Sequence, residues 1–188
     1  MYNRINKRQF IKTGILGLTG IYLGLKNKLF GNTIDTYSQK SFAGRDLWKW
    51  SREASHYVPT PRGVKCMICP NECILKEGEL STCNNRVNEG GKLYTIAYGN
   101  PCAVHIDPIE KKPLYHFLPS SRAFSIATAG CNLACLNCQN WTISQTSPRK
   151  TRNYDLMPRA LVEKAYKDKC DSIAYTYSEP IIFYEYTY

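Results

Sequence analysis

Runs of apolar residues predict strands in three parts of the chain. Residues 93–99 alternate in character and end at a glycine, which indicates a strand followed by a turn. Residues 123–129 and residues 172–177 form two further strand-like runs. Residues 107–117 contain two prolines, which exclude a long helix or a central strand and favour a surface loop of mixed charge.

Helical spacing predicts a helix between the last two strands, over residues 158–169. Its buried face would hold Ala160, Leu161 and Ala165, with Lys164, Lys167 and Asp168 outside. A second helix is expected over residues 181–186. The order strand, loop, helix, strand, helix predicts an α/β fold built from βαβ units, in which ligand sites lie at the carboxyl ends of the strands.

The first thirty residues have the pattern of a signal peptide. A basic start precedes a glycine-rich apolar stretch over residues 14–25, which is shorter than the ~20 residues that span a bilayer. Residues 7–12 are similar to a twin-arginine (Tat) export signal, with Lys7 in place of the first arginine. This predicts export or membrane association; the alternative is a leader without export on a cytoplasmic protein. Residues 31–60 are predicted to be a polar linker, with a short helix near 44–54.

Positive charge is concentrated near the start of the chain. The formal net charge is +10, and residues 1–60 hold ten Lys and Arg against three Asp and Glu. Residues 61–188 hold fifteen against twelve, so the excess does not belong to a folded basic face. We therefore expect no nucleic-acid partner.

Seven of the nine cysteines fall into two groups, and grouped cysteines more often bind metal than form disulfides in an intracellular type of enzyme. The first group comprises Cys66, Cys69, Cys73 and Cys83, in a predicted small Cys-rich domain over residues 61–118. Four thiolates form a closed ligand set, which favours a structural metal site. Zinc, an iron–sulfur cluster and disulfides all remain open for this group.

The second group comprises Cys131, Cys135 and Cys138, directly after the strand predicted at 123–129. Three thiolates on one loop can hold three irons of a [4Fe-4S] cube and leave the fourth iron open to a substrate. Two alternatives are an iron–sulfur electron carrier and a zinc-binding structural module. Both need a fourth ligand, for which Cys102, His105 and His116 are the candidates.

Several motifs resemble one family in their order along residues 64–188. They are Cys-x2-Cys-Pro-x2-Cys at 66–73, Tyr-Gly at 98–99, Asp-Pro-Ile-Glu-Lys-Lys-Pro-Leu-Tyr-His-Phe at 107–117, and the cysteine segment at 130–145 with Gln-Asn-Trp-x-Ile-Ser-Gln at its end. The spacing Cys-x3-Cys-x2-Cys is typical of radical SAM enzymes. The whole set resembles the radical SAM enzyme of the AmmeMemoRadiSam system, a relative of pyruvate formate-lyase activating enzyme.

The resemblance implies a fold and two cofactors. The fold would be a truncated radical SAM partial (β/α) barrel over residues 119–188, preceded by the Cys-rich loop/β domain and by a signal-like helix within residues 1–30. The cofactors would be a [4Fe-4S] cluster and S-adenosylmethionine, with zinc or a second iron–sulfur cluster at the first group. Glu179, Ser178 and Asn140 would contact S-adenosylmethionine; the alternative for Glu179 is a helix N-terminal carboxylate.

The resemblance also implies an activity, partners and two departures. An activating-enzyme-like oxidoreductase would cleave S-adenosylmethionine reductively, and the 5′-deoxyadenosyl radical would abstract hydrogen from a substrate such as a peptidyl glycine. A flavodoxin- or ferredoxin-like reductant, a protein substrate and companion proteins of the system are expected. Asn137 replaces the usual aromatic residue that contacts adenine, and Ser81 replaces a glycine. Since a barrel has about six βα units, we expect a fragment with exposed apolar edges at 123–129 and 172–177.

Overall fold

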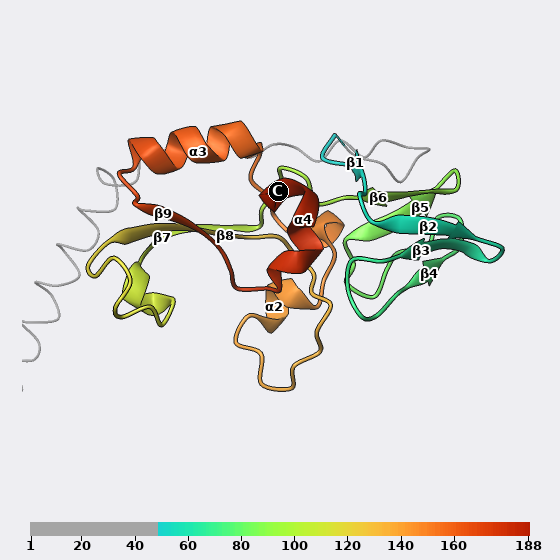
Figure 1. Ribbon diagram of the computed structural model, residues 1–188, viewed down its shortest axis with the longest axis horizontal. Coiled ribbons are helices and arrows are strands. Elements are labelled where there is room, and N and C mark those ends of the chain that lie inside the picture. Colours follow the sequence, from blue (N-terminus) through green and yellow to red (C-terminus); the bar gives the residue numbers. More distant parts are fainter. Residues whose placement is uncertain (1–48) are drawn as a thin grey trace, which may run out of the picture. The chain divides into compact units, whose positions relative to one another are not determined.

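Short antiparallel strands fill the first half of residues 49–188, the part of the chain that the computed structural model describes (Figure 1). The first sheet has the order β1-β6-β5 and the second the order β2-β3-β4. The strand bounds are Arg52–Glu53 (β1), Tyr57–Thr60 (β2), Gly63–Cys66 (β3), Ile74–Leu75 (β4), Arg86–Glu89 (β5) and Lys92–Thr95 (β6). All neighbouring strands in these two sheets are antiparallel.

Two glycines close the hairpin between β5 and β6. Glu89 pairs with Lys92, so Gly90 and Gly91 form a two-residue turn. Both have positive φ, 62° and 75°, which is the conformation of a type I′ turn and which glycine adopts without steric cost. The strand predicted over residues 93–99 is confirmed as β6, although it ends at Thr95.

The structure describes only the last part of the predicted N-terminal segment and linker, from residue 49 onward. The signal-like segment at 1–30 and residues 31–48 of the predicted linker lie outside the described residues. The helix expected near 44–54 is wrong for its described part, because Arg52–Glu53 form β1, and β2 also lies within the predicted linker. Within residues 49–188, no helix is long and apolar enough to cross a membrane.

The third sheet contains the βαβ unit that the sequence predicts. It has the order β7-β8-β9, formed by Ala103–Pro108, Arg122–Ala127 and Ser172–Tyr175. β8 and β9 are parallel, and the helix α3 (Pro158–Lys167) lies between them along the chain. The shorter helices are η1 (Ile109–Lys111), α2 (Trp141–Ser144), η2 (Pro148–Lys150), η3 (Pro180–Phe183) and α4 (Tyr184–Thr187).

This sheet differs from the expectation in two respects. β7 pairs antiparallel with β8 along its whole length, so part of the predicted loop at 107–117 belongs to a strand. β8 therefore lies between two strands and has no exposed edge, whereas β9 pairs only with β8 among the described strands (Figure 1). Pro108 is tolerated because it stands at the end of an edge strand. Three strands of mixed direction make a mixed α/β arrangement, and no barrel is formed within residues 49–188.

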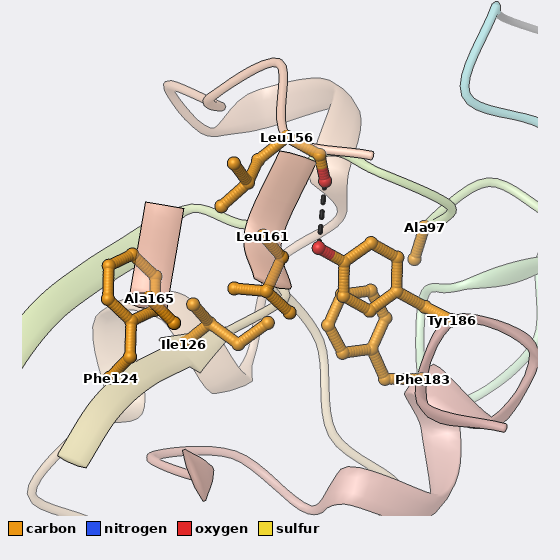
Figure 2. Close-up of a cluster of buried hydrophobic side chains, with 8 residues drawn as sticks. All are labelled: Ala97, Phe124, Ile126, Leu156, Leu161, Ala165, Phe183 and Tyr186. Carbon is orange, nitrogen blue, oxygen red and sulfur yellow. Dashed lines mark hydrogen bonds between the residues drawn. The ribbon is translucent and has the colours of Figure 1, made fainter. Parts of the chain in front are cut away.

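The main core lies between the sheet and the helices α3 and α4 (Figure 2). Leu161 and Ala165 are buried there, as predicted, but Ala160 is exposed, which corrects the predicted face of α3. Phe183 and Tyr186 stack with ring centroids 4.3 Å apart. The Tyr186 hydroxyl donates a 2.8 Å hydrogen bond to the carbonyl oxygen of Leu156. The segment after β9 is thus fixed to the core by packing and by a buried hydrogen bond.

A buried ion pair joins the cysteine-rich strands to α4. Arg86 in β5 and Glu185 in α4 have side chains only 0% and 4% exposed. Both terminal nitrogens of Arg86 donate 2.9 Å hydrogen bonds to the two Glu185 oxygens, and the Ser55 amide donates to Oε1 at 3.1 Å. Burial opposes ionisation of Glu185, but the Arg86 hydrogen bonds and charge outweigh it and hold its pKa below the usual value.

Replacing Glu185 by glutamine leaves the buried Arg86 charge without a counter-charge. We expect Glu185→Gln to lower the free energy of unfolding by about 3 kcal/mol or more, measured by urea denaturation. Glu163→Gln is the matched control, because Glu163 and Arg159 form an exposed pair on α3 and its loss costs less than about 1 kcal/mol.

The pH dependence of the free energy of unfolding, compared between wild type and Glu185→Gln, tests whether the Glu185 charge causes the loss of stability. Because its folded pKa is depressed, Glu185 stabilises the fold above the ordinary pKa of 4.5, and this contribution is lost as the pH falls through the folded pKa. The difference in stability between wild type and Glu185→Gln therefore shrinks below pH 4.5. A difference that stays constant down to acid unfolding contradicts the electrostatic explanation.

Candidate functional site

The second cysteine group lies on a loop at the carboxyl end of β8. The cysteine loop, residues 130–140, runs from Gly130 to the start of α2. Its base is closed by a 2.8 Å hydrogen bond from the Gly130 amide to the carbonyl oxygen of Ile143. The thiols of Cys131 and Cys138 are half-buried and that of Cys135 is exposed. The loop therefore presents its three predicted ligands at the strand end where α/β folds bind ligands.

Gly130 fits its place only because it has no side chain. Its φ is +91°, and an ideal Cβ there would lie 2.2 Å from the carbonyl oxygen of Cys83. The side-chain amide of Asn71 also donates a 3.0 Å hydrogen bond to the Asn132 carbonyl oxygen. The Cys83 backbone and the Asn71 side chain, both from the cysteine-rich part of the chain, thus lie against the start of the cysteine loop. The sequence contains both cysteine groups, but it does not reveal that they are neighbours.

A second segment, residues 177–180, joins the cysteine loop from the end of β9. The Ser178 hydroxyl donates a 3.1 Å hydrogen bond to the carbonyl oxygen of Thr128, just before the loop. The Asn140 amide donates a 3.0 Å hydrogen bond to the carbonyl oxygen of Tyr177, at the other end of the loop. Both ends of the loop are therefore bonded to the segment that carries the predicted cofactor residues.

The carboxylate of Glu179 caps the helix η3. Its Oε1 accepts from the amide of Ile181 at 3.4 Å, and the side chain is half-buried. This is the helix-terminal role that the sequence left open beside the cofactor role. A 3.4 Å contact is at the weak end of hydrogen bonding, so the carboxylate is available to a stronger donor.

Tyr177 is a site residue that the sequence analysis missed. It has a positive φ of 67°, which costs energy for a bulky side chain and persists where surrounding contacts impose it. Its hydroxyl donates to Asp107 at 2.5 Å, and the Lys112 nitrogen lies 4.8 Å from its ring centroid. The sequence shows Asp107 and Lys112 in the segment 107–117. It does not show that both contact Tyr177, which is sixty-five or more residues away along the chain.

Asp107 and Tyr177 hold each other in fixed protonation states. Burial opposes ionisation of Asp107, but hydrogen bonds from Lys112, Tyr177 and Lys111 outweigh it and keep its pKa well below the usual range. Burial, followed by the Asp107 hydrogen bond, raises the pKa of Tyr177. At neutral pH Asp107 is thus an acceptor and Tyr177 a donor, and β7 is tied to the end of β9.

The first cysteine group begins at the end of β3, where Cys66 is the last strand residue. The Cys66 amide donates a 2.9 Å hydrogen bond to the Cys73 carbonyl oxygen, and Cys69 lies in the turn between them. Cys66 and Cys83 are buried, whereas Cys69 and Cys73 are half-buried. Burial raises the pKa of the Cys66 and Cys83 thiols, and the nearby Arg86 charge partly offsets this. All nine cysteines are free thiols, so no disulfide is formed.

The thiols of neither group are gathered as metal ligands. Within residues 49–188, no three His, Cys, Asp or Glu side chains are arranged to hold a metal ion. Cys102, His105 and His116, the candidates for a fourth ligand, are likewise not part of any such group within residues 49–188. The Cys102 thiol is half-buried, and burial raises its pKa to about 11.

The donor set and its surroundings nevertheless fit a bound group at the cysteine loop. The loop carries three thiols and no carboxylate or imidazole, which is the ligand chemistry of iron–sulfur clusters. Around its base, in the described structure, the side-chain oxygens of Thr128 and Asn132 and both amide atoms of Asn85 are buried without hydrogen-bond partners. Such atoms usually have partners, so polar groups bound at the loop would satisfy them.

Comparison with known proteins finds a relative that is similar over most of this chain. The chain is 50% identical over 138 residues to the uncharacterized protein MJ0808 of Methanocaldococcus jannaschii, which covers 73% of this chain and 41% of that protein. The chain thus spans about two fifths of the length of this relative. No family model and no solved structure matches the chain.

Adding one methyl group at Gly130 tests the contact between the two cysteine groups. We expect Gly130→Ala to lower the free energy of unfolding by clearly more than the ~1 kcal/mol that alanine costs at a positive φ, because its Cβ would also meet the Cys83 carbonyl. Gly91→Ala is the matched control, since Gly91 has a similar φ of +75° and nothing within 4 Å of its Cβ position. Equal losses in urea unfolding would mean that the contact is absent.

Proposed function

We propose that this chain carries the cofactor-binding part of a radical SAM enzyme. In this proposal Cys131, Cys135 and Cys138 bind three irons of a [4Fe-4S] cluster, and the fourth iron binds S-adenosylmethionine. The observation that carries it is the pair of hydrogen bonds joining Ser178 to Thr128 and Asn140 to Tyr177. They bond the ends of the loop that carries the predicted cluster ligands to the segment that carries Ser178 and Glu179, which supports a shared site.

The residues after β9 would bind and orient S-adenosylmethionine. Glu179 would accept hydrogen bonds from its ammonium group, exchanging a weak 3.4 Å contact for a charge-assisted one. Ser178 and Asn140 would fix the backbone from which Glu179 projects, and the unpartnered side chains of Thr128 and Asn132 suit its polar methionine end. The strained Tyr177, locked by Asp107, would keep this segment in one conformation.

The chemistry comes from the cofactors and the protein directs it. When bound, the cluster would supply the electron for the reductive cleavage of S-adenosylmethionine. That electron would come from a flavodoxin- or ferredoxin-like reductant. The radical would then abstract a hydrogen atom from the substrate, and the chain's own role is orientation and exclusion of water.

The partners and location of the whole protein are further proposals, because the chain spans only part of its relative. A protein substrate, such as one with a reactive peptidyl glycine, and companion proteins of the AmmeMemoRadiSam system are proposed from the resemblance. Export or membrane association rests on residues 1–30, which lie outside the described residues.

Anaerobic reconstitution with iron and sulfide tests the cluster. We expect the chain to bind iron, to give an electron paramagnetic resonance signal on reduction, and to release 5′-deoxyadenosine from S-adenosylmethionine. Cys135→Ser should abolish the release and most of the signal, because it would remove one proposed cluster ligand; Cys135 is exposed, so the change does not disturb the core. Cys170→Ser is the control, since Cys170 lies outside both groups. Iron without cleavage would favour an electron carrier, and zinc without iron a zinc-binding module.

Replacing Glu179 by glutamine tests the cofactor segment. The glutamine side chain retains an oxygen that can cap η3 but loses the charge, so we expect S-adenosylmethionine to bind roughly tenfold more weakly. The measurement is a titration of the resonance signal of the reduced cluster. Glu163→Gln, an exposed change of the same kind on α3, should leave the affinity unchanged. An unchanged affinity in Glu179→Gln would leave Glu179 with its capping role alone.

A further inference from the structure

Arg86 is an unusual residue because a fully buried guanidinium has one nitrogen without a partner. Its two terminal nitrogens bind Glu185, but its Nε–H is buried and unpaired among the described residues. A buried N–H of a charged group normally donates a hydrogen bond to an acceptor, and leaving that hydrogen bond unmade is costly. An acceptor for this N–H is therefore expected close to Arg86.

Two cysteines of the first group are linked to the surroundings of Arg86 by geometry. The Ser81 hydroxyl accepts a 3.1 Å hydrogen bond from the Arg86 amide and lies 3.1 Å from the Cys83 sulfur. Cys66 and Cys73 belong to one apolar cluster, in which Cys66 is buried and Cys73 packs against it. A neutral thiol is a weak acceptor, whereas a metal-bound thiolate is a strong one. The unpaired N–H thus suits thiolates better than the free thiols that the structure records.

Two of the four thiols contact hydroxyl groups. The Cys83 sulfur lies 3.1 Å from the Ser81 hydroxyl, and the Cys73 sulfur lies 3.4 Å from the Thr82 hydroxyl. Rotation about χ1 would release each sulfur from its hydroxyl. The backbone hydrogen bond between Cys66 and Cys73 already brings two ligand positions together.

We propose that Cys66, Cys69, Cys73 and Cys83 bind one tetrahedral metal ion as thiolates, and that the Nε–H of Arg86 donates a hydrogen bond to one of these sulfurs. Each thiol releases its proton to solvent as it binds. Zinc and mononuclear iron share this four-thiolate chemistry. Arg86 is a positioning residue: through Glu185 it connects the metal centre to α4, directly after the segment 177–180. The site does not depend on the proposed radical chemistry.

Metal content and cobalt spectroscopy test the four ligands. Both are measured in the Cys135→Ser chain, whose cysteine loop lacks one proposed cluster ligand. The result is then independent of the proposed function. We expect the Cys135→Ser chain to retain about one equivalent of zinc or iron per chain, the analysis of metal content telling the two apart. Titration with cobalt should give the intense visible bands of a tetrahedral four-thiolate site. Adding Cys69→Ser should remove both, and adding Cys170→Ser should change neither. A Cys135→Ser chain that binds no metal, or a Cys69→Ser change without effect, overturns the site.

The role of Arg86 is tested by Arg86→Lys in the same background. Lysine keeps the positive charge but has no Nε–H donor, so zinc should bind about tenfold to a hundredfold more weakly and the sulfur-to-cobalt band should shift. Arg159→Lys on the surface of α3 is the matched control and should leave both unchanged. If Arg86→Lys lowers stability but leaves the zinc affinity and the cobalt band of the folded protein as in the control, Arg86 does not contact the metal centre.

Discussion

The buried ion pair between Arg86 and Glu185 determines how the cysteine-rich strands meet the sheet that carries the cysteine loop. Neither charge is exposed to water, so each requires the other, and their bidentate geometry permits one arrangement. A buried pair of this kind adds little net stability compared with apolar residues, but its loss on one side is severe. Its effect is to specify a position: β5 is fixed against α4, and α4 follows the segment 177–180.

Three smaller constraints act within the arrangement that this pair establishes. Gly130 allows the Cys83 backbone to lie against the base of the cysteine loop. Ser178 and Asn140 bond both ends of that loop to the end of β9. Asp107 holds Tyr177 in a conformation that a tyrosine rarely adopts. Together they give the site a fixed backbone before any cofactor binds, which lowers the cost of binding one.

The sequence predicted the parts of the site that depend on local pattern. Periodicity located β8, α3 and β9, and the spacing of Cys131, Cys135 and Cys138 located the loop between them. It missed β7, because His105, Asp107 and Pro108 do not look like a strand, although an edge strand tolerates them. Ala160 was misplaced because α3 buries a narrower face than its apolar residues suggested. The Arg86–Glu185 and Asp107–Tyr177 pairs join residues far apart in the chain, and such pairings cannot be found in a single sequence without an alignment.

In the proposed function, the cluster on the cysteine loop has one open iron, and S-adenosylmethionine binds to it. Electron–nuclear double resonance on the reduced, reconstituted chain tests this directly, with S-adenosylmethionine carrying ¹⁵N in its amino group. We expect a ¹⁵N hyperfine coupling of the size that direct coordination to iron gives, and its loss in the Cys135→Ser chain. A reduced cluster whose spectrum is the same with and without the labelled cofactor would contradict it.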